Sequence, residues 1–323
     1  MPTQLSDSDL KEIAEKINDG IEELSIKTLR DKPRTHLGIS EIGEPCMRQL
    51  YYKFRWCFFQ EFDGRMLRLF KRGHREEERY VSYLEGIGCK VDRFEASVLN
   101  HHPESDNYFY SSEFDPCDAL VHDVTGYPDH EKLAAERGIK PKQFRVSGVM
   151  GHYGGSCDGR VITPWLPDKM LLECKTHNTK SFCKYISDGL HKSKPMHYDQ
   201  MCGYGWKMDL HYGIYFPENK NDDEIKVSVI RLDHQRGMQL ERKAEEIITA
   251  KEPPPKISEN PAFFNCKYCD AKEICHEGKI PLKNCRSCRL STPVENAEWH
   301  CSRFNSNIPA EYIAAGCDGW VPI

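Results

Sequence analysis

Charged residues inside strand-like apolar segments constrain the fold of this chain more than any other feature of its sequence. Residues 157–175 read CDGRVITPWLPDKMLLECK, which is two apolar runs joined by a turn. Side chains alternate between the two faces of a strand, so Glu173 and Lys175 project from the same face of the second run. Asp158 begins the first run, and a hairpin between the runs would bring its carboxylate beside Glu173 and Lys175.

These charges need partners, because an unpaired charge inside a protein costs several kcal/mol. Two arrangements provide them. In one, Glu173 and Lys175 form a structural ion pair. In the other, the carboxylates of Asp158 and Glu173, together with the backbone carbonyl of Cys174, hold a divalent cation. An open, oxygen-rich site of this kind suits Mg²⁺ or Mn²⁺.

A helix expected over residues 64–88 supplies a third acid. Among the consecutive acids Glu76, Glu77 and Glu78, only Glu77 shares the apolar stripe of that helix, so it alone should face the interior. The stripe contains Phe70, Tyr80, Val81 and Leu84. The same helix has one basic face, which consists of Arg65, Arg68, Arg72 and Arg75. This face could bind phosphates, or it could simply be exposed to solvent.

The strand pair resembles the active-site motif of the PD-(D/E)XK nuclease superfamily. Asp158 stands at the position of the first acid, and Glu173, Cys174 and Lys175 stand at the positions of the E-x-K triplet. Cys157 precedes the aspartate where the family usually has proline, a departure that the superfamily tolerates.

Flanking segments are similar to the RecB-type branch of that superfamily. RGHREEERYVSYLEGIG resembles the leading helix of the branch, with Glu77 at its acidic position. HYDQMCGYGWKM looks like the later Gln-x3-Tyr motif, carried by Gln200 and Tyr204, and Lys207 lies on the same helical face. The resemblance extends over about residues 37–250.

The resemblance implies an α/β fold with a restriction-endonuclease-like core, in which helices flank a mixed central β-sheet. It implies a catalytic Mg²⁺ or Mn²⁺ ion held by Glu77, Asp158, Glu173 and the backbone carbonyl of Cys174. The implied catalytic residues are Glu77, Asp158, Glu173, Lys175 and Gln200. The implied DNA contacts come from Arg65, Arg68, Arg72, Arg75, Tyr204 and Lys207.

Breaks in composition divide the chain into three parts. Residues 1–36 form an N-terminal helical segment, and residues 37–252 form the nuclease core. A stretch rich in His, Asp, Ser and Pro marks an insertion in the core at about residues 89–143. Three consecutive prolines then end the last core helix, because proline cannot continue it. Residues 253–323 are expected to be a Cys-rich metal-binding tail that packs back on the core.

Fifteen cysteines are present, and six of them crowd between residues 266 and 301 of this tail. In a reducing compartment such crowding indicates metal ligands rather than disulfides. Cys266, Cys269 and Cys275 form one group, and the resemblance supplies Cys46 as its fourth member. CRISPR-associated adaptation nucleases and AddB-type helicase-nucleases hold a [4Fe–4S] cluster in this way. Zinc suits the same four residues, and in another partition Cys46 stays free while the tail alone forms one or two zinc sites.

A second group in the tail consists of Cys285, Cys288 and Cys301. His276 is the preferred fourth ligand, because His300 directly precedes Cys301 and adjacent ligands strain a tetrahedral site. This set predicts a structural Zn²⁺ ion. The other cysteines are expected to be small core residues, namely Cys57, Cys89, Cys117, Cys183, Cys202 and Cys317.

Charge and hydropathy limit the surroundings in which this chain can work. The net charge of −5 is not basic, so attraction to DNA must come from a local field. No apolar run approaches the roughly 20 residues that cross a bilayer. The polar start MPTQLSDSDL lacks the features of a signal peptide. We therefore expect a cytoplasmic protein, in the host cytoplasm if phage-encoded, that does not enter a membrane.

Three functions fit these features. The first is a metal-dependent DNA exonuclease that hydrolyses phosphodiester bonds at single- or double-stranded ends in phage-type recombination, with a strand-annealing protein, recombinase or helicase as partner. The second is a structure-specific or restriction-like endonuclease on the same core. The third is a non-catalytic zinc-ribbon DNA-binding module. The complete set of Glu77, Asp158, Glu173 and Lys175 argues against the third, because a binding module has no use for it.

Overall fold

The computed structural model describes residues 6–29, 33–111 and 121–323. At its centre lies a five-stranded sheet in the order β13-β12-β11-β10-β2. Strands β11 and β12 run parallel and the other neighbours antiparallel, so the sheet is mixed, as the sequence predicts. The strands are β2 (Lys90–Asp92), β10 (Gly159–Thr163), β11 (Leu166–His177), β12 (Tyr212–Asn219) and β13 (Ser228–Arg231).

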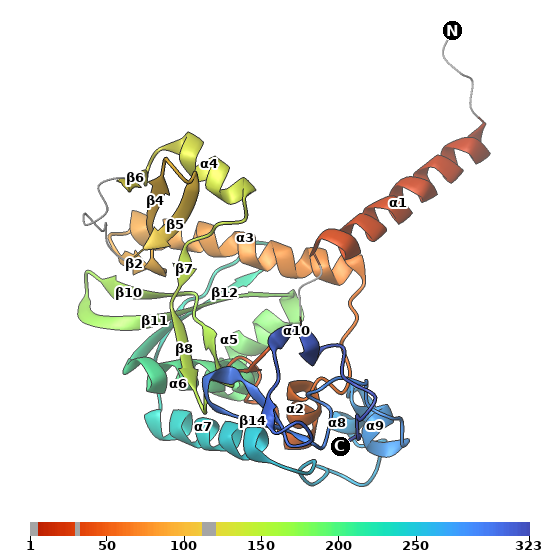
Figure 1. Cartoon of the computed structure of the whole chain (residues 1–323). Helices are drawn as coiled ribbons and strands as arrows, with labels where there is room; N and C mark the ends of the chain where they lie inside the picture. Colours follow the sequence, from red (N-terminus) through yellow and green to blue (C-terminus); the bar gives the residue numbers. More distant parts are fainter. Residues whose placement is uncertain (1–5, 30–32, 112–120) are drawn as a thin grey trace.

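Helices cover both faces of this sheet (Figure 1). The side chains of β11 alternate as expected. Leu171 packs in a core with residues of the helices on one face, whereas Leu172 packs on the other face with Tyr80 and Leu84. The predicted mixed α/β architecture is therefore confirmed. The helix on the Leu172 side is α3 (Gly64–Gly86), and those on the Leu171 side are α5 (Thr179–Ser193), α6 (Pro195–Met208) and α7 (His234–Thr249).

The first helix, α1 (Asp7–Leu29), extends away from the body of the protein (Figure 1). Its N-cap is Ser6, whose hydroxyl accepts a hydrogen bond from the Asp9 backbone N–H at 3.2 Å. The Asp9 carboxylate accepts one from the Ser6 N–H at 2.8 Å, which completes a capping box. The apolar stripe of α1 is exposed and consists of Leu10, Ile13, Ile17, Ile21 and Leu24. No helix in the described ranges is long and apolar enough to cross a membrane.

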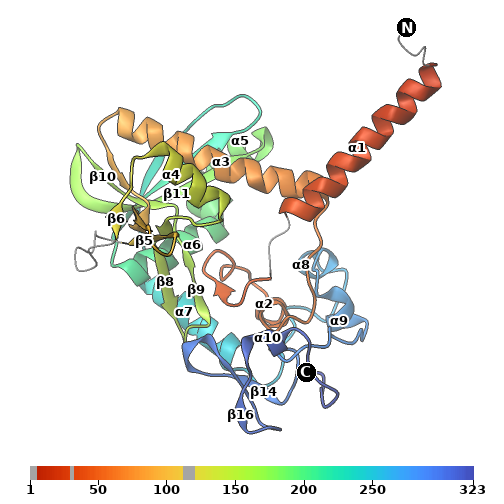
Figure 2. The ribbon, with the colours of Figure 1, turned by 45° about the horizontal axis from the view of Figure 1, so that its top comes forward.

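Much of the expected insertion forms a small lobe on the α3 side of the sheet (Figures 1 and 2). Strand β2 belongs to the central sheet, so the lobe begins after Asp92 and not at residue 89. A short ladder between β3 (Phe94–Ala96) and β7 (Lys142–Gln143) joins it to the body. Its other elements are β4 (Val98–His102), β5 (Asn107–Ser111), β6 (His122–Asp123) and α4 (Pro128–Glu136), around a core of Leu99, Tyr108, Val124 and Ala134.

A second, three-stranded sheet links the N-terminal part of the core to the strand before Asp158. Its order is β1-β9-β8, with β1 (Leu37–Gly38) parallel to β9 (Tyr153–Ser156). Strand β8 (Arg145–Gly148) runs antiparallel to β9. Because β9 leads directly into β10, this sheet sets the direction from which the chain enters the central sheet at Asp158.

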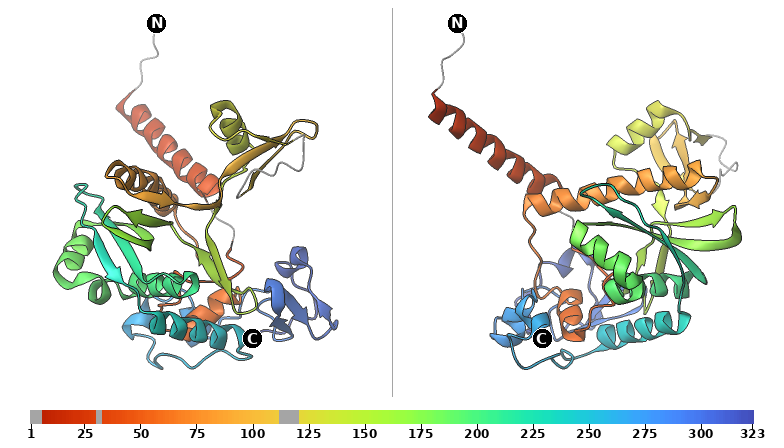
Figure 3. Two further views of the ribbon diagram at one scale, coloured as in Figure 1. Left: turned by 90° about the vertical axis from the view of Figure 1, so that its left-hand side faces the viewer. Right: turned by 180° about the vertical axis from the view of Figure 1, so that it is seen from behind.

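The Cys-rich tail lies against α2 (Met47–Phe54), on the side of the protein away from the lobe (Figures 2 and 3). The guanidinium of the fully buried Arg286 lies 4.7 Å from the ring centre of Phe54 and 4.9 Å from that of Trp299. These contacts join the tail to the core. The tail comprises α8 (Phe264–Lys267), α9 (Lys272–His276), β14 (Ser291–Pro293), η1 (Glu295–Ala297), β15 (Trp299–Cys301), β16 (Ser306–Asn307) and α10 (Ala310–Ile313).

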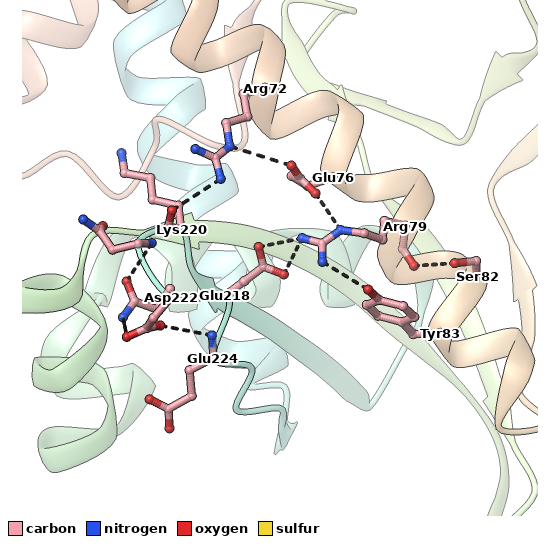
Figure 4. Close-up of polar contacts among 11 residues, drawn as sticks. Arg72, Glu76, Arg79, Ser82, Tyr83, Glu218, Lys220, Asp222 and Glu224 are labelled. Carbon is pink, nitrogen blue, oxygen red and sulfur yellow. Dashed lines mark hydrogen bonds and ion pairs between the residues drawn. The ribbon is translucent and has the colours of Figure 1, made fainter.

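A buried ion pair fixes α3 against the end of β12 (Figure 4). Arg79 donates from Nη2 to both carboxylate oxygens of Glu218, at 2.7 and 2.6 Å, and from Nε to Glu76 at 2.7 Å. The Glu218 side chain is fully buried, whereas that of Arg79 is 34% exposed. Burial raises the pKa of Glu218 and Arg79 opposes that rise. The position of α3 therefore depends on Arg79 as the cationic partner of a buried acid.

Replacing Arg79 with alanine should lower the free energy of unfolding by about 3 kcal/mol, because Glu218 would keep its place in the interior without a partner. Urea unfolding followed by circular dichroism measures the change. Arg65→Ala, on the exposed face of the same helix, is the control and should change the free energy by less than about 0.5 kcal/mol. Equal stability of the two variants would show that this ion pair does not hold α3.

Candidate active site

Asp158 stands at the bend directly before the first residue of β10. Strands β10 and β11 form the predicted hairpin, and their register pairs Gly159 with Leu172, so Asp158 lies opposite Glu173. The Asp158 carboxylate accepts a hydrogen bond at 2.7 Å from the backbone N–H of Cys174. The N–H and C=O groups of one strand residue point to the same edge, so the carbonyl of Cys174 lies on this side too.

Glu173 and Lys175 project together from the same face of β11, as predicted. The Glu173 side chain is fully buried and that of Lys175 is 28% exposed. The Lys175 ammonium contacts Glu173 Oε1 as an ion pair. Within the described chain neither Glu173 oxygen accepts a hydrogen bond with the direction that a strong bond requires. The ion pair expected as one of two arrangements is thus present, and it leaves the carboxylate with unused acceptor capacity.

Glu77 reaches the same region from α3. Its carboxylate lies 3.3 Å from Arg93 Nη2, at the junction of β2 and β3. The side chains of Glu77 and Glu76 are 20% and 19% exposed, so the prediction that Glu77 alone turns inward is wrong. Glu76 is occupied by Arg79, whereas Glu77 faces the acids of the hairpin. Sequence reasoning missed Arg93, because an arginine after a short strand has no distinctive spacing.

Electrostatics show how closely the three acids interact. The pKa of Glu77 is raised to about 7. Burial is the main cause and the charge of Asp158 the second, while Arg93 acts in the opposite direction. Burial also raises the pKa of Glu173 to about 7, against the opposing effect of Lys175. Burial lowers the pKa of Lys175, but Glu173 and Asp158 outweigh it and leave the net pKa above its ordinary value. The positive charges of Lys175 and Arg93 therefore do not offset the combined effect of burial and of the neighbouring acids on these two carboxylates.

A divalent cation would supply the missing charge, so the donor set fits the implied metal. Its oxygens come from Glu77, Asp158, Glu173 and the Cys174 carbonyl, which are the hard ligands that Mg²⁺ and Mn²⁺ prefer. In residues 6–29, 33–111 and 121–323 no three His, Cys, Asp or Glu side chains are already arranged around a common metal position. Ligation therefore requires these carboxylates to turn toward one point.

Helix α6 carries Gln200, Tyr204 and Lys207 on one face, as predicted, but this face points into the protein. Gln200 and Tyr204 are buried, and Lys207 Nζ pairs with Glu241 of α7 at 2.7 Å. The Tyr204 hydroxyl donates to the Ser156 carbonyl at 2.7 Å. The burial of Tyr204 and the ion pair of Lys207 do not favour direct DNA contact by these two residues, which stays a prediction. The small and apolar residues that surround these positions are the signal of a helix buried on all sides.

The arginines of α3 line its exposed face, as expected; they are Arg65, Arg68, Arg72 and Arg75. Three of them already have acidic partners, and the first is Arg65, whose Nε lies 4.0 Å from the Asp63 carboxylate. Arg68 donates to Glu22 of α1 at 3.1 Å, and Arg72 lies 3.7 Å from Glu76. Arg75 has no ion pair within the described residues. The positive charge of this row is thus partly neutralised by acids, and Arg75 is the arginine most available to bind a phosphate.

Two histidines flank Lys175, although no sequence motif singled them out. His177 Nε2 and His197 Nδ1 each lie 2.8 Å from the hydroxyl of Tyr215. Burial lowers the pKa of His177 to about 4 and that of His197 to about 3, and the charge of Lys175 contributes to both. Both imidazoles are therefore neutral at physiological pH and form a polar wall beside the lysine.

The cysteines of the first predicted group lie near one another, although within the described residues they do not yet surround a common metal position. Cys46, Cys266, Cys269 and Cys275 line one pocket between the start of α2 and the short helices α8 and α9. Arg48 donates to the sulfur of Cys275 at 3.8 Å. Burial raises the pKa of Cys269, and the nearby thiols of Cys46 and Cys275 raise it further. The approach of four thiols across more than 200 residues of sequence fits a common ligand, as either an iron–sulfur cluster or zinc requires.

The second cysteine group differs from the sequence prediction. Cys285, Cys288 and Cys301 line another pocket, and its fourth cysteine is Cys317, which was expected to be a core residue. His276 instead lies at the first pocket, beside Cys275. Proximity in sequence favoured His276 as the fourth ligand. In the structure, the turn after α10 instead returns the chain to the pocket at Cys317.

No protein-family model matches the sequence, and no curated protein matches it. Solved structures similar to this one include SSO0001, at 13% identity over 80% of this chain and 96% of its own, with a TM-score of 0.40. The alkaline exonuclease LHK-Exo from Laribacter hongkongensis is 16% identical over 70% of this chain and 90% of its own, with a TM-score of 0.38. A phage-related exonuclease from Haemophilus somnus 129PT is 16% identical over 36% of this chain and 62% of its own, with a TM-score of 0.25.

The raised pKa values of the acids predict a pH-dependent stability. Between about pH 4.5 and 7, Glu77 and Glu173 bind more protons in the folded state than in the unfolded chain, so stability falls as pH rises through this window. With a metal chelator present, the free energy of unfolding of the wild type should fall by an amount on the order of 2–3 kcal/mol between these pH values. In Glu173→Gln the fall should be about half as large. Urea unfolding at pH 5 and pH 7.5 measures it. Identical losses in the two proteins would contradict the assignment.

Proposed function

We propose that this chain is a metal-dependent deoxyribonuclease of the PD-(D/E)XK type that hydrolyses phosphodiester bonds at DNA ends. One observation carries the proposal. Three acids and a lysine from two strands and a helix gather at one end of a mixed sheet, and their mutual charge effects mark them as a common site. The RecB-type resemblance of the sequence motifs favours ends as the place of attack.

Each residue has a separable task in hydrolysis. When bound, a divalent cation supplies Lewis-acid polarisation of the phosphate and screening of its charge. Asp158 is held in place for ligation by the N–H of Cys174, and Glu77 by Arg93. Lys175 remains charged because its pKa lies above the ordinary value. Its ammonium stabilises the negative charge that develops on the phosphate and orients the attacking water as a donor.

DNA binding requires cations near the site, and the exposed face of α3, the helix that carries Glu77, supplies them. Arg75 and its neighbours on that helix are the cations available there to bind phosphates. Gln200 remains a catalytic candidate. It lies on the same buried face of α6 as Tyr204. In phage-type recombination the resected end would pass to a strand-annealing protein, a recombinase or a helicase in the cytoplasm.

The first cysteine pocket has a structural role in this proposal. We assign a [4Fe–4S] cluster to Cys46, Cys266, Cys269 and Cys275, with zinc as the alternative. A centre at this place joins the start of α2 to the tail and so closes a loop of more than 200 residues. The nuclease site lies elsewhere, on the sheet.

The wild-type protein with Mg²⁺ or Mn²⁺ should degrade linear duplex DNA and spare a covalently closed circle, because an exonuclease needs an end. Glu173→Gln and Lys175→Ala should each slow the degradation at least about 100-fold while the fold and DNA binding persist. Gel assays and filter binding measure the two properties. Lys169→Ala is the matched control, since Lys169 lies on the same strand and face but is exposed.

Degradation of the circle at a rate similar to that of linear DNA would indicate the endonuclease instead. Full activity of Glu173→Gln or Lys175→Ala would refute the catalytic assignment. If the wild type binds DNA and cleaves neither substrate, the non-catalytic module is the better description.

Cys46→Ser should remove the visible absorption near about 400 nm that thiolate-ligated iron–sulfur centres show in anaerobically purified protein. Cys183→Ser, which changes an exposed cysteine outside both pockets, should keep it. Zinc in the wild type without iron would select the alternative metal. Unchanged metal content in Cys46→Ser would exclude Cys46 as a ligand.

A further inference from the structure

The second cysteine pocket brings together residues from three separate parts of the tail. Cys285 and Cys288 flank a turn before β14, Cys301 ends β15, and Cys317 follows α10. All four line the same pocket. Burial raises the pKa of Cys285, and the thiols of Cys317, Cys288 and Cys301 follow as the next causes in that order. Cys317 thus lines the same pocket as Cys285, although 32 positions separate them in sequence.

The backbone around these sulfurs is arranged as it is around bound thiolates. The Val321 N–H donates to the Cys288 sulfur at 3.4 Å. The nearby backbone of Gly316 lowers the pKa of Cys285, against the effect of burial, while the Gly316 N–H donates to the Tyr312 carbonyl at 3.2 Å. The Cys288 N–H returns to the Cys285 carbonyl at 3.2 Å, which closes the turn between them. N–H donors directed at sulfur favour the negatively charged form, which is the form that binds a metal.

Gly316 shows that the last turn is shaped to bring Cys317 inward. Its φ is +66°, a conformation that residues with a side chain rarely adopt. A Cβ atom at this position would meet the backbone of Asn284 at 3.2 Å. The glycine thus lets the chain after α10 pass close to the residue before Cys285, and the next residue is Cys317.

The part of the tail around this pocket consists of short elements and exposed aromatic side chains. Its strands β14, β15 and β16 have only two or three residues each. Phe304 and Tyr312, at the edge of the pocket, are 65% and 61% exposed. A unit of this size without a substantial apolar core usually depends on a metal or on disulfides. Each of these four cysteines is free of disulfides.

We propose that Cys285, Cys288, Cys301 and Cys317 bind one structural zinc ion. Four thiolates in a closed set leave no open coordination position, which is the arrangement of structural zinc sites. On binding, each thiol gives its proton to solvent and its sulfur forms one bond to the metal. The ligation draws the four side chains inward from the pocket walls. The site is independent of nuclease activity, so it stands or falls separately from the proposed function.

The test measures zinc in the full-length protein after gel filtration, by inductively coupled plasma mass spectrometry. Cys317→Ser should lower the zinc content by one equivalent per chain, whatever metal the first pocket holds. His276→Ala, the change at the ligand that the sequence suggests, should keep that equivalent, as should the exposed control Cys183→Ser. Loss of the zinc in His276→Ala, or its retention in Cys317→Ser, would overturn the proposal.

A second measurement uses the wild type and so does not depend on the folding of a variant. Cys317 should resist alkylation by iodoacetamide in the zinc-loaded protein and react after a chelator is added, as peptide mass spectrometry reports. Cys183 should react at once in both states. Equally fast alkylation of Cys317 and Cys183 before chelation would refute zinc ligation. Iron in place of zinc at this pocket would refute the identity of the metal.

Discussion

The burial of one carboxylate on the central sheet determines how this site is built. Glu173 has no access to solvent, and its direct partner is the ammonium of Lys175 on the same strand. The hairpin register then places Asp158 opposite it, and the ion pair of Arg79 with Glu218 keeps α3 where Glu77 reaches the same region. Three acids, Glu77, Asp158 and Glu173, thus share this region with two cations, Lys175 and Arg93. Burial raises the pKa of both Glu77 and Glu173 to about 7, because removal from water disfavours their charged forms.

Much of this arrangement was predictable because it follows local periodicity. The alternation of β11 separates Glu173 from Cys174, and helical spacing brings Glu77 inward. Tertiary contacts decide the rest. Glu76 is as buried as Glu77 because Arg79 holds it, and the packing of α7 over α6 turns Tyr204 away from solvent. Sequence distance also conceals Cys317, since only the turn at Gly316 brings it back to Cys285.

Helix α2 connects the two halves of the molecule. Cys46 stands at its first turn, and Arg55 at its end donates to the Cys288 carbonyl at 2.9 Å. Arg286 inserts among aromatic rings and its pKa falls to about 9, mainly through burial and then through the charge of Arg55. Two buried arginines so close together are tolerated because aromatic faces and backbone carbonyls compensate part of their charge. The tail is thereby held by polar contacts as much as by apolar packing.

The attachment of the lobe has a mechanical consequence. The short ladder of β3 and β7 connects it to the body, and Arg93 occupies the residue just before that ladder. A hinge at this ladder would lie directly beside the 3.3 Å contact of Arg93 with Glu77, so a rotation of the lobe about it would change the surroundings of that acid.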